Sequence, residues 1–289
     1  MDYLIKALAR KGRVRVYIAC TTKVANDAIL THDLWPSAAS VLGKTLTIGL
    51  LMGSMLKGEE ALTIKIDGNG PIGVVVVDSN SKGEVRGYVG HPHVHFSREN
   101  SLDDVTTLGY NGYIDIIKDL KLKDLYQSTV PLQTGDLAKD FTFYFASSEQ
   151  TPTLTSLGTV INEDNTAELC GGIIIQLMPD AREEDIEFLE FKTPILSKFS
   201  ELLSEYKDLK MILKLIFGDD CKTLEKMDVS YHCNCSKDKF ARGIASLGSA
   251  EIQDIIKTDE KAEVICHYCR KQYIYSKDDL EKIEKESKR

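Results

Sequence analysis

Three short runs of apolar and β-branched residues follow one another in the first third of the chain. They cover residues 61–66, 72–78 and 84–90, and each has the length of a single strand. Turn-forming residues separate them, at 67–71 and again at 80–83. Consecutive strands joined by tight turns form an antiparallel meander. The pattern therefore predicts a small antiparallel sheet in this part of the chain.

A longer apolar segment, residues 36–56, precedes these strands. Pro36 suits the first turn of a helix, where its missing N–H is not needed. Lys44 lies near the centre of the segment, and several serines and threonines interrupt it. A membrane span needs about 20 predominantly apolar residues without such a charge. The segment is predicted to be a buried helix of a folded domain.

Further elements follow in the middle of the chain. Residues 135–150 are predicted to form a helix that ends before Pro152, because a residue preceding proline avoids the helical region. Two β-like runs, 154–161 and 171–178, flank a polar turn at 162–165. Helices and antiparallel strands thus succeed one another without a strict alternation. The sequence predicts an α+β domain, residues 1–179.

The character of the chain changes over residues 180–228. Apolar residues recur there at the spacing of one helical face, and the segment carries 13 acidic and 8 basic residues. The apolar positions are Ile195, Leu196, Phe199, Leu202, Leu203, Tyr206, Leu209, Ile212, Leu213 and Ile216. We interpret the segment as an amphipathic helical linker docked on the first domain. The alternative is a detachable segment whose apolar face is covered only while it is docked.

Charge and composition narrow the class of protein. The 289 residues carry a formal charge of −8, with 43% hydrophobic and 28% charged residues, as in ordinary globular proteins. The C-terminal region, residues 229–289, is nearly neutral and has no basic stripe. These features argue against binding to nucleic acid or to an anionic membrane. The chain also begins without a recognisable signal peptide, so a cytoplasmic protein is expected.

Four of the seven cysteines form two close pairs near the C-terminus, Cys233 with Cys235 and Cys266 with Cys269. Each pair lies on one predicted turn, and two such pairs can complete a tetrahedral zinc site. The C-x-C spacing is unusual for structural zinc and leaves two thiolates crowded. A lone redox pair is the alternative for Cys266 and Cys269, but the βαβ context of such motifs is absent. We expect one Zn²⁺ per chain, bound by these four thiolates.

The remaining candidates for chemistry are weaker. His232 and His267 lie beside the cysteines and are expected to be bystanders, and Cys20, Cys170 and Cys221 are expected to be buried or incidental thiols. Gly43-Lys44-Thr45 lacks the glycine and the preceding strand of a phosphate-binding loop. The histidines at 91, 93 and 95 are interrupted by Pro92, which favours a surface loop over a metal site. Residues 147–150 offer a hydroxyl and a carboxylate without a histidine partner. The sequence therefore predicts a protein that is not an enzyme.

Taken together, these residues resemble the heat shock protein 33 family of redox-regulated cytosolic holdase chaperones. The matching residues in the C-terminal region are Cys233-Asn234-Cys235-Ser236-Lys237, Leu247-Gly248, Cys266-His267-Tyr268-Cys269 and Tyr273. Those in the N-terminal region are Gly135-Asp136-Leu137-Ala138-Lys139-Asp140, Tyr144-Phe145, Ser148-Glu149-Gln150-Thr151-Pro152, Cys170-Gly171-Gly172 and Gln176-Leu177-Met178-Pro179. The resemblance spans essentially the whole chain.

The resemblance implies a chaperone that works without ATP and is inactive while reduced and zinc-bound. Oxidants would pair Cys233 with Cys235 and Cys266 with Cys269, release the zinc and unfold the zinc-binding redox-switch domain, residues 229–289. The apolar surface of the 180–228 linker would then bind unfolding client proteins and prevent their aggregation. The oxidised form is expected to be a homodimer and to pass its clients to ATP-dependent folding chaperones.

Two other classes of protein compete with this interpretation. The first is a constitutive zinc-ribbon protein that binds a protein or a nucleic acid, although the charge of residues 229–289 argues against the nucleic acid. The second is an enzyme in the N-terminal domain with an appended structural zinc, for which no site is evident. Zinc release together with a gain in aggregation suppression would separate the chaperone from both.

Overall fold

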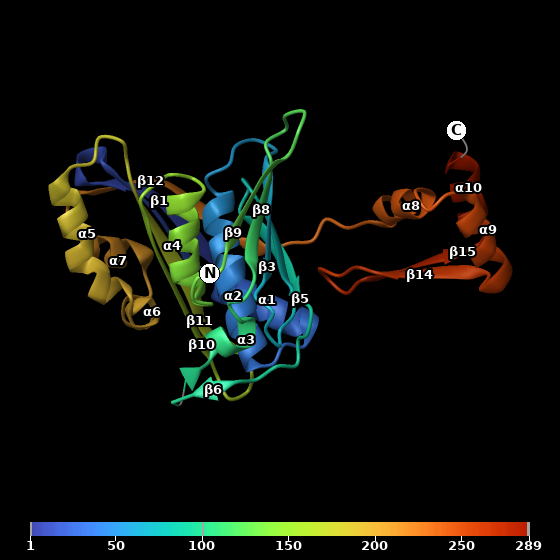
Figure 1. Ribbon diagram of the computed structural model, residues 1–289, viewed down its shortest axis with the longest axis horizontal. Helices are drawn as coiled ribbons and strands as arrows, with labels where there is room; N and C mark the ends of the chain where they lie inside the picture. The colour runs from blue at the N-terminus through green and yellow to red at the C-terminus, as the bar shows by residue number, and fades with distance from the viewer. Residues whose placement is uncertain (1, 100, 288–289) are drawn as a thin grey trace. The chain divides into compact units, whose positions relative to one another are not determined.

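The computed structural model describes residues 2–99 and 101–287 and divides into two compact units (Figure 1). The first unit covers residues 1–232 and the second covers residues 233–289. The α+β class expected from the sequence is confirmed, with helices and mainly antiparallel strands in both units. No helix among the described residues is long and apolar enough to cross a membrane.

One sheet of the first unit has five strands in the order β10-β11-β2-β1-β12. Its strands are β1 (Tyr3–Ala9), β2 (Val14–Cys20), β10 (Thr153–Ile161), β11 (Ala167–Leu177) and β12 (Cys221–Asp228), all antiparallel to their neighbours. A 3₁₀ turn, η1 (Arg10–Gly12), joins β1 to β2. The chain therefore returns to its first strand after more than 200 residues, and the two ends of the unit are tied by backbone hydrogen bonds.

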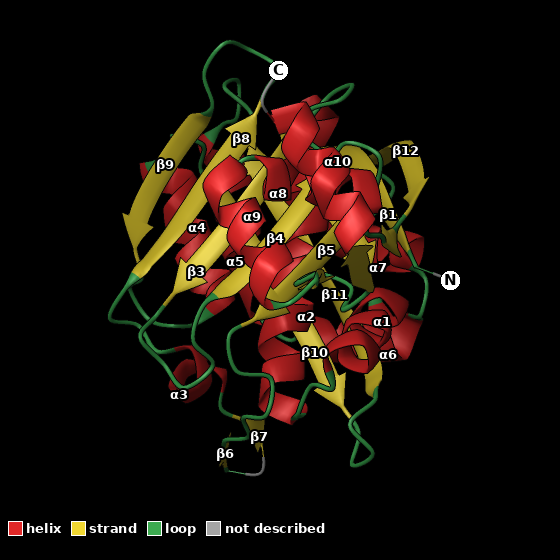
Figure 2. Ribbon diagram, turned by 90° about the vertical axis from the view of Figure 1, so that its right-hand side faces the viewer, coloured by secondary structure: helices red, strands yellow, loops and turns green. Residues whose placement is uncertain are grey.

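The second sheet has six strands in the order β13-β5-β4-β3-β8-β9. Figure 2 labels five of them, β5, β4, β3, β8 and β9. They are β3 (Ala61–Asp67), β4 (Val75–Asn80), β5 (Glu84–Val89), β8 (Tyr113–Asp119), β9 (Tyr126–Pro131) and the short β13 (Ser230–Tyr231). The predicted meander is confirmed, because β3, β4 and β5 are consecutive antiparallel neighbours. A small hairpin, β6 (Ser97–Arg98) and β7 (Ser101–Leu102), precedes the short helix α3 (Asp104–Leu108).

Helix α2 (Pro36–Gly53) lies between the two sheets, beside α1 (Thr22–His32) (Figure 1). Sixteen of its 18 residues are buried, which confirms the buried helix predicted for residues 36–56. Helix α4 (Leu137–Ser147) begins at Asp136, whose side chain caps it by accepting hydrogen bonds from the backbone N–H groups of Ala138 and Lys139. This helix too is confirmed, with its end three residues before the predicted one.

Three helices follow β11 along the chain: α5 (Glu183–Leu196), α6 (Phe199–Tyr206) and α7 (Leu209–Phe217). Their apolar residues form a second core with the face of β1, β2 and β11 that points away from α2. Gly158 on β10 allows a close approach, since a Cβ there would lie 2.6 Å from the backbone nitrogen of Ser200 in α6. In this structure the apolar face of residues 180–217 is thus covered by a sheet.

Residues 221–228 differ from the expected helical linker, because they form the edge strand β12. Most of its side chains are exposed, so β12 is held mainly by backbone pairing with β1, supported by an ion pair between Lys6 and Glu225 at 2.9 Å. A strand without a buried face leaves no apolar alternation for sequence analysis to detect. The pairing with a strand at the other end of the chain decides its conformation.

The second unit contains α8 (Lys237–Ala245), α9 (Ser249–Thr258), the antiparallel hairpin of β14 (Lys261–Ile265) and β15 (Gln272–Ser276), and α10 (Lys277–Ser287). Its core is small. The buried hydrophobic residues are Ile244, Ile252, Tyr273, Tyr275, Leu280 and Ile283. The two strands of this hairpin flank the turn that carries Cys266 and Cys269.

Candidate metal centre

The four paired cysteines come from two loops of the second unit. Cys233 and Cys235 lie in the extended segment that leads into α8, whereas Cys266 and Cys269 lie in the turn between β14 and β15. This turn is closed by backbone hydrogen bonds from Cys266 N–H to the Lys271 carbonyl and from Arg270 N–H to the Cys266 carbonyl, both 2.9 Å. Arg270 adopts a positive φ of 58° to make the turn. Local backbone geometry thus turns both thiols of this pair to the same side.

The four sulfur atoms converge, and all lie within 4.8 Å of one another. Two contacts run between the two pairs, with 3.3 Å from Cys235 Sγ to Cys269 Sγ and 3.8 Å from Cys233 Sγ to Cys266 Sγ. A regular tetrahedron with Zn–S bonds of about 2.3 Å has sulfur–sulfur edges of about 3.8 Å. The observed spacing therefore fits four thiolates around one tetrahedral ion such as Zn²⁺.

The surroundings of the sulfurs are uneven. Cys266 is buried and the other three are half-buried. The Tyr273 hydroxyl lies 3.2 Å from Cys235 Sγ and 3.1 Å from the Cys235 carbonyl oxygen. Burial alone would raise the pKa of the Cys235 thiol, but hydrogen bonds from Tyr273 and Cys269 outweigh it and lower the pKa to about 7. These contacts thus make the Cys235 thiol easier to ionise than an ordinary cysteine.

The neighbouring thiols behave in the opposite way. Burial raises the pKa of Cys269 to about 12, and the sulfurs of Cys235 and Cys233 add to that rise. Burial also raises the pKa of Cys266. Four thiols in one site cannot all lose their protons at neutral pH unless a cation compensates the negative charges of the thiolates. The geometry brings four thiols together, and a divalent soft cation is the group that allows them to become four thiolates.

The two neighbouring histidines do not belong to the cluster. Among the described residues, the group with metal-ligand spacing consists of the four cysteines. His232 belongs to the first unit, where its backbone N–H donates to the Val85 carbonyl. His267 occupies the turn between the two cysteines of the second pair. The structure therefore brings together all four predicted ligands without either imidazole.

The other motifs weighed in the sequence are structural in their contacts. His93 lies in a loop, 2.9 Å from Asp33, and His91 lies 2.9 Å from the Pro71 carbonyl oxygen. Glu149 accepts hydrogen bonds of 2.5 Å from Tyr144 and Lys118, which fasten the end of α4 to β8. His91, His93 and Glu149 thus each have a hydrogen-bond partner of their own, and these contacts do not bring the three side chains together in one site.

The three remaining cysteines lie in the first unit and are free thiols. Cys170 is buried beside the hydroxyl groups of Thr47 and Thr159, each 3.4 Å from its sulfur. Cys20 and Cys221 are half-buried, and burial raises the pKa of both thiols. A raised pKa keeps a thiol protonated and unreactive at neutral pH.

Sequence reasoning did not identify the role of Tyr273. The alternation of Tyr273 and Tyr275 with exposed residues marks β15 as a strand with one buried face. It does not show which atom the Tyr273 hydroxyl contacts. Only the pairing of β14 with β15 places this hydroxyl against the Cys235 sulfur. A hydrogen bond from an outer residue to a metal-ligating atom is a recurrent feature of metal sites.

The fold and the cluster together define a class: an α+β protein whose small C-terminal unit carries a four-cysteine cluster that could hold a metal ion. Comparison with known families identifies it further. A family model described as "Hsp33 protein" matches residues 2–276. The chain therefore belongs to the Hsp33 family, and the family resemblance expected from the sequence is confirmed.

Individual relatives are similar to this chain over nearly its full length. The chain is 45% identical to the 33 kDa chaperonin of Bacillus velezensis over 291 aligned positions, covering all of both chains. It is 46% identical to the 33 kDa chaperonin of Geobacillus kaustophilus, over 100% of this chain and 99% of that one. The crystal structure of the 33 kDa chaperonin of Thermotoga maritima superposes with a TM-score of 0.90 at 32% identity, covering 98% of each chain.

Proposed function

We propose that this chain is a redox-regulated, ATP-independent holdase chaperone that acts in the cytoplasm on unfolding client proteins. The observation that carries the proposal is the convergence of four thiols in a unit with a very small core. The family to which the chain belongs, and the names of its relatives, support the chaperone class. The proposal assigns no catalytic reaction, no nucleic acid and no membrane to the chain.

In the resting state Cys233, Cys235, Cys266 and Cys269 would bind one Zn²⁺. The bound ion supplies charge compensation, which keeps all four sulfurs as thiolates at neutral pH. These residues would also join the loop before α8 to the β14–β15 hairpin, two segments more than 30 residues apart. A structural zinc site contributes on the order of 10–16 kcal/mol to a small domain. The thiolates would therefore stabilise the fold of the unit through the bound ion and would also be the groups that an oxidant attacks.

Oxidation by a peroxide would convert the thiolates to disulfides, Cys233 with Cys235 and Cys266 with Cys269. For each disulfide, two thiolate sulfurs lose two electrons and form one S–S bond. The peroxide O–O bond accepts these electrons and, with two protons, yields two molecules of water. Two equivalents of peroxide complete both bonds. Disulfide sulfurs carry no negative charge and no longer bind the ion, so the site loses its metal.

Loss of the metal would unfold the second unit. Six buried hydrophobic residues are a small core for a domain of about 60 residues, a size at which folding is marginal without a metal or disulfides. Disulfides between near neighbours close very short loops and remove little chain entropy, so they would not restore the fold. Cys233 follows His232 directly, and unfolding would therefore begin immediately after the last strand of the first unit.

Release of the 180–228 segment would then expose apolar surface for client binding. Phe199 and Leu202 of α6 and Leu209 and Ile212 of α7 are at most 5% exposed against the first sheet. Contiguous exposed apolar surface of this kind binds other partly unfolded chains. We further propose that the oxidised form is a homodimer and that bound clients pass to ATP-dependent folding chaperones after reduction.

The test combines metal release with chaperone activity. The zinc-loaded, reduced protein and the peroxide-treated protein are compared for zinc content, for disulfide connectivity by peptide mass mapping, and for suppression of aggregation of a heat-unfolding client. Oxidation should release about one zinc per chain and suppress aggregation. Cys233→Ser should lower the zinc content of the reduced protein, whereas Cys221→Ser should retain it as a matched control.

Two outcomes would contradict the proposal. Zinc release without suppression of aggregation would favour the rival class, a constitutive zinc-ribbon interaction protein. Unchanged zinc content in Cys233→Ser would show that the ligand assignment is wrong. The mapping also decides the connectivity, because the sulfurs of Cys235 and Cys269 lie in direct contact across the two pairs.

A further inference from the structure

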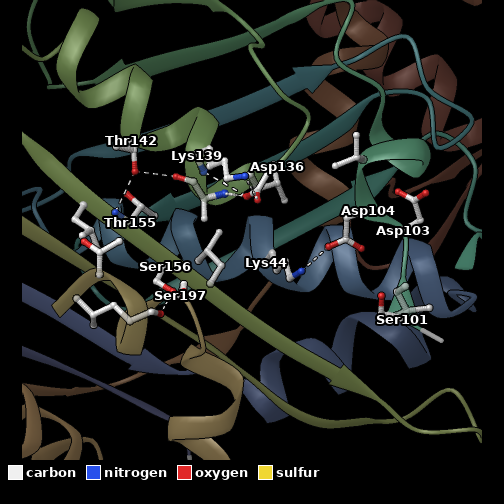
Figure 3. A pocket seen from close by; sticks show the side chains of 18 of the residues that line it. Lys44, Ser101, Asp103, Asp104, Asp136, Lys139, Thr142, Thr155, Ser156 and Ser197 are labelled. Atoms are coloured by element: carbon white, nitrogen blue, oxygen red, sulfur yellow. Dashed lines mark hydrogen bonds and ion pairs between the residues drawn. The ribbon is translucent and has the colours of Figure 1, made fainter. Parts of the chain in front are cut away.

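A cavity of about 670 Å³ lies in the first unit, and none of its lining residues belongs to the cysteine cluster (Figure 3). Its walls come from α2, the hairpin of β6 and β7 with the following α3, the start of α4, β10 and the C-terminal end of α5. A cavity of this volume is within the range that small-molecule sites occupy. Nothing in the proposed chaperone mechanism uses it.

One wall carries a buried ion pair. The Lys44 ammonium of α2 donates to Asp104 Oδ2 at 2.5 Å, and the Ser40 hydroxyl donates to the same oxygen at 3.1 Å. Burial alone would lower the pKa of Lys44, but the nearby Asp104 carboxylate outweighs this and raises it, so the ammonium stays charged. An ammonium has three donors, and one of them meets Asp104 here. The pair thus offers donors and an acceptor side by side.

Two polar atoms of the cavity walls have no hydrogen-bond partner among the described residues. They are Asp104 Oδ1 and Thr155 Oγ1, and neither has exposed surface of its own. Thr155 is only 7% exposed, and its backbone N–H is already bonded to the Thr142 hydroxyl (Figure 3). An unsatisfied buried polar group destabilises the fold, and a charged group such as Asp104 does so more than a hydroxyl. The Asp104 side chain remains 14% exposed, so rotation of its carboxylate can present either oxygen to a bound group.

The charges around the cavity do not suit an anion. Four acidic and three basic side chains line it. Lys44 is already paired with Asp104, and the N-terminus of α4 is capped by Asp136. The backbone N–H groups that could bind a phosphate at this helix are therefore occupied by a carboxylate. An uncharged ligand meets no such repulsion.

The rest of the lining is apolar or carries hydroxyl groups. Its apolar members are Leu102, Val105, Leu137, Ala138, Leu154, Leu157 and Leu196. Apolar walls with a few convergent polar groups are the usual composition of a small-molecule site. A ligand with an apolar body would bury it here, with its polar head against Lys44 and Asp104.

We propose that this cavity binds a compact, uncharged molecule with an amide-type head and an apolar body. The head would accept a hydrogen bond from Lys44 and donate one to Asp104, and the body would contact the leucines. An amide carries both functions on one carbon, an acceptor oxygen and a donor N–H, as the ion pair requires. Neither a carboxylate nor an ammonium provides both at neutral pH.

The site also touches the segment that the proposed chaperone mechanism releases. Thr193, Leu196 and Ser197 come from the end of α5, whereas the other walls come from residues 44–157. The Ser156 hydroxyl already bonds the Leu196 carbonyl oxygen at 2.6 Å, so α5 closes the cavity while it is docked. A ligand that contacts both parts binds the docked form preferentially and opposes its release. This regulatory half of the inference rests on the proposed function, whereas the binding half does not.

The binding test uses three probes of one size and different charge: benzamide, benzoate and benzamidinium. Each is titrated into reduced, zinc-loaded, methyl-labelled full-length protein, and NMR shifts of Leu137, Leu154 and Leu196 are followed. Benzamide should bind saturably in the millimolar range, as expected for so small a molecule. Benzoate and benzamidinium should bind at least about tenfold more weakly, a difference of about 1.4 kcal/mol.

Matched variants locate the site. Ala138 lines the cavity, whereas Ala146 lies on the same helix with an exposed side chain. Ala138→Trp should fill the cavity and weaken benzamide binding at least about tenfold, and Ala146→Trp should leave it unchanged. Equal binding of all three probes, no saturable binding of benzamide, or equal effects of the two variants would overturn the proposed site.

The regulatory half has its own readout. Limited proteolysis within residues 180–228 is measured after oxidation, with and without benzamide at several times its dissociation constant. Cleavage should slow by about the factor 1 + [L]/Kd in wild type and not in Ala138→Trp. Binding without protection would overturn the regulatory half alone. A chain that binds benzamide but shows no holdase activity on oxidation would overturn the proposed function and leave the site standing.

Discussion

At the scale of single residues, Tyr273 links the small core of the second unit to the cysteine cluster. Its ring is buried and packs against Phe240, with centroids 5.3 Å apart, while its hydroxyl reaches the sulfur and the carbonyl oxygen of Cys235. Tyr275 lies two residues further along the same strand, and its hydroxyl donates instead to the Lys237 carbonyl oxygen at 2.6 Å. The two tyrosines therefore differ in whether they contact a sulfur.

This difference predicts different effects on metal binding. Tyr273→Phe should weaken zinc affinity at least about tenfold, because loss of an outer hydrogen bond to a ligand costs 10- to 100-fold. Tyr275→Phe should destabilise the unit by about 1 kcal/mol without a comparable effect on affinity. Competition with a chromophoric chelator measures both dissociation constants in the reduced protein. An equal loss of affinity in both variants would show that the Tyr273 hydroxyl acts only through the fold.

The cysteine positions themselves were accessible to sequence analysis because their spacing is a local property. Two ligands so close along the chain converge whatever the rest of the chain does. Cys266 and Cys269 lie in the predicted turn, whereas Cys233 and Cys235 lie in an extended segment instead of the predicted turn. The hydroxyl of Tyr273 was not accessible in this way. Its direction depends on the side chain's length and on a strand pairing that the spacing does not encode.

At the scale of elements, α5 is fastened to the first sheet by a buried carboxylate. Asp185 has no exposed side-chain surface, and it accepts hydrogen bonds from Arg10 at 2.8 Å and from Arg13 at 2.6 and 3.0 Å. The backbone N–H of Arg182 donates to it as well, at 3.0 Å. The Arg13 hydrogen bond holds the pKa of Asp185 well below its usual range in spite of its burial. Its contribution to stability is thus present at neutral pH and is lost only as the pH falls through that lowered pKa.

Asp185→Asn should therefore loosen α5 in the reduced, zinc-loaded protein. The variant leaves two arginines beside a neutral partner. The free-energy cost of breaking a buried ion pair is larger than the ~1.4 kcal/mol that corresponds to a tenfold change in an equilibrium constant. We expect cleavage by limited proteolysis between residues 180 and 197 to accelerate at least about tenfold. Glu190→Gln removes the same charge from an exposed position on the same helix and should leave the rate unchanged. Equal rates in the two variants would contradict an anchoring role for Asp185.

Elements with strong periodicity were predicted correctly, and those without it were not. The buried run of α2, the capped start of α4 and the β-like runs of β10 and β11 each leave a local pattern. β12 leaves none, because nearly all of its side chains are exposed and its partner β1 lies at the opposite end of the sequence. Backbone pairing carries no side-chain signature, so such an edge strand is determined by tertiary structure.

At the scale of the whole molecule, the two units differ in how much core they have. The first unit has two extensive clusters of buried hydrophobic residues on the two faces of its five-stranded sheet. The second unit has a single small cluster and the four thiols. Stability from apolar burial grows with the size of the core, so we expect the smaller unit to depend far more on a bound metal.

This contrast predicts selective unfolding on metal removal. A zinc chelator under reducing conditions should abolish hydrogen-exchange protection in α8, α9 and the β14–β15 hairpin, because about 10–16 kcal/mol of metal binding is lost. Protection of β2 and β11 in the first unit should remain. Exchange followed by mass spectrometry resolves the two units. If the hairpin kept its hydrogen-exchange protection without zinc, the apolar core alone would be sufficient to keep it folded, and the metal would not be what stabilises it.

The sequence by itself determined the four cysteine positions, the α+β class, the meander and the apolar faces of α6 and α7. Each of these depends on the spacing of residues that are close in the sequence, and this spacing determines local turns, strands and helix faces. The tertiary structure alone decided the pairing of β1 with β12, the burial of Asp185 between two arginines, the reach of Tyr273 to a sulfur, and the cavity beside Lys44 and Asp104. These features join residues between 38 and more than 200 positions apart, and such contacts depend on the packing of the whole chain.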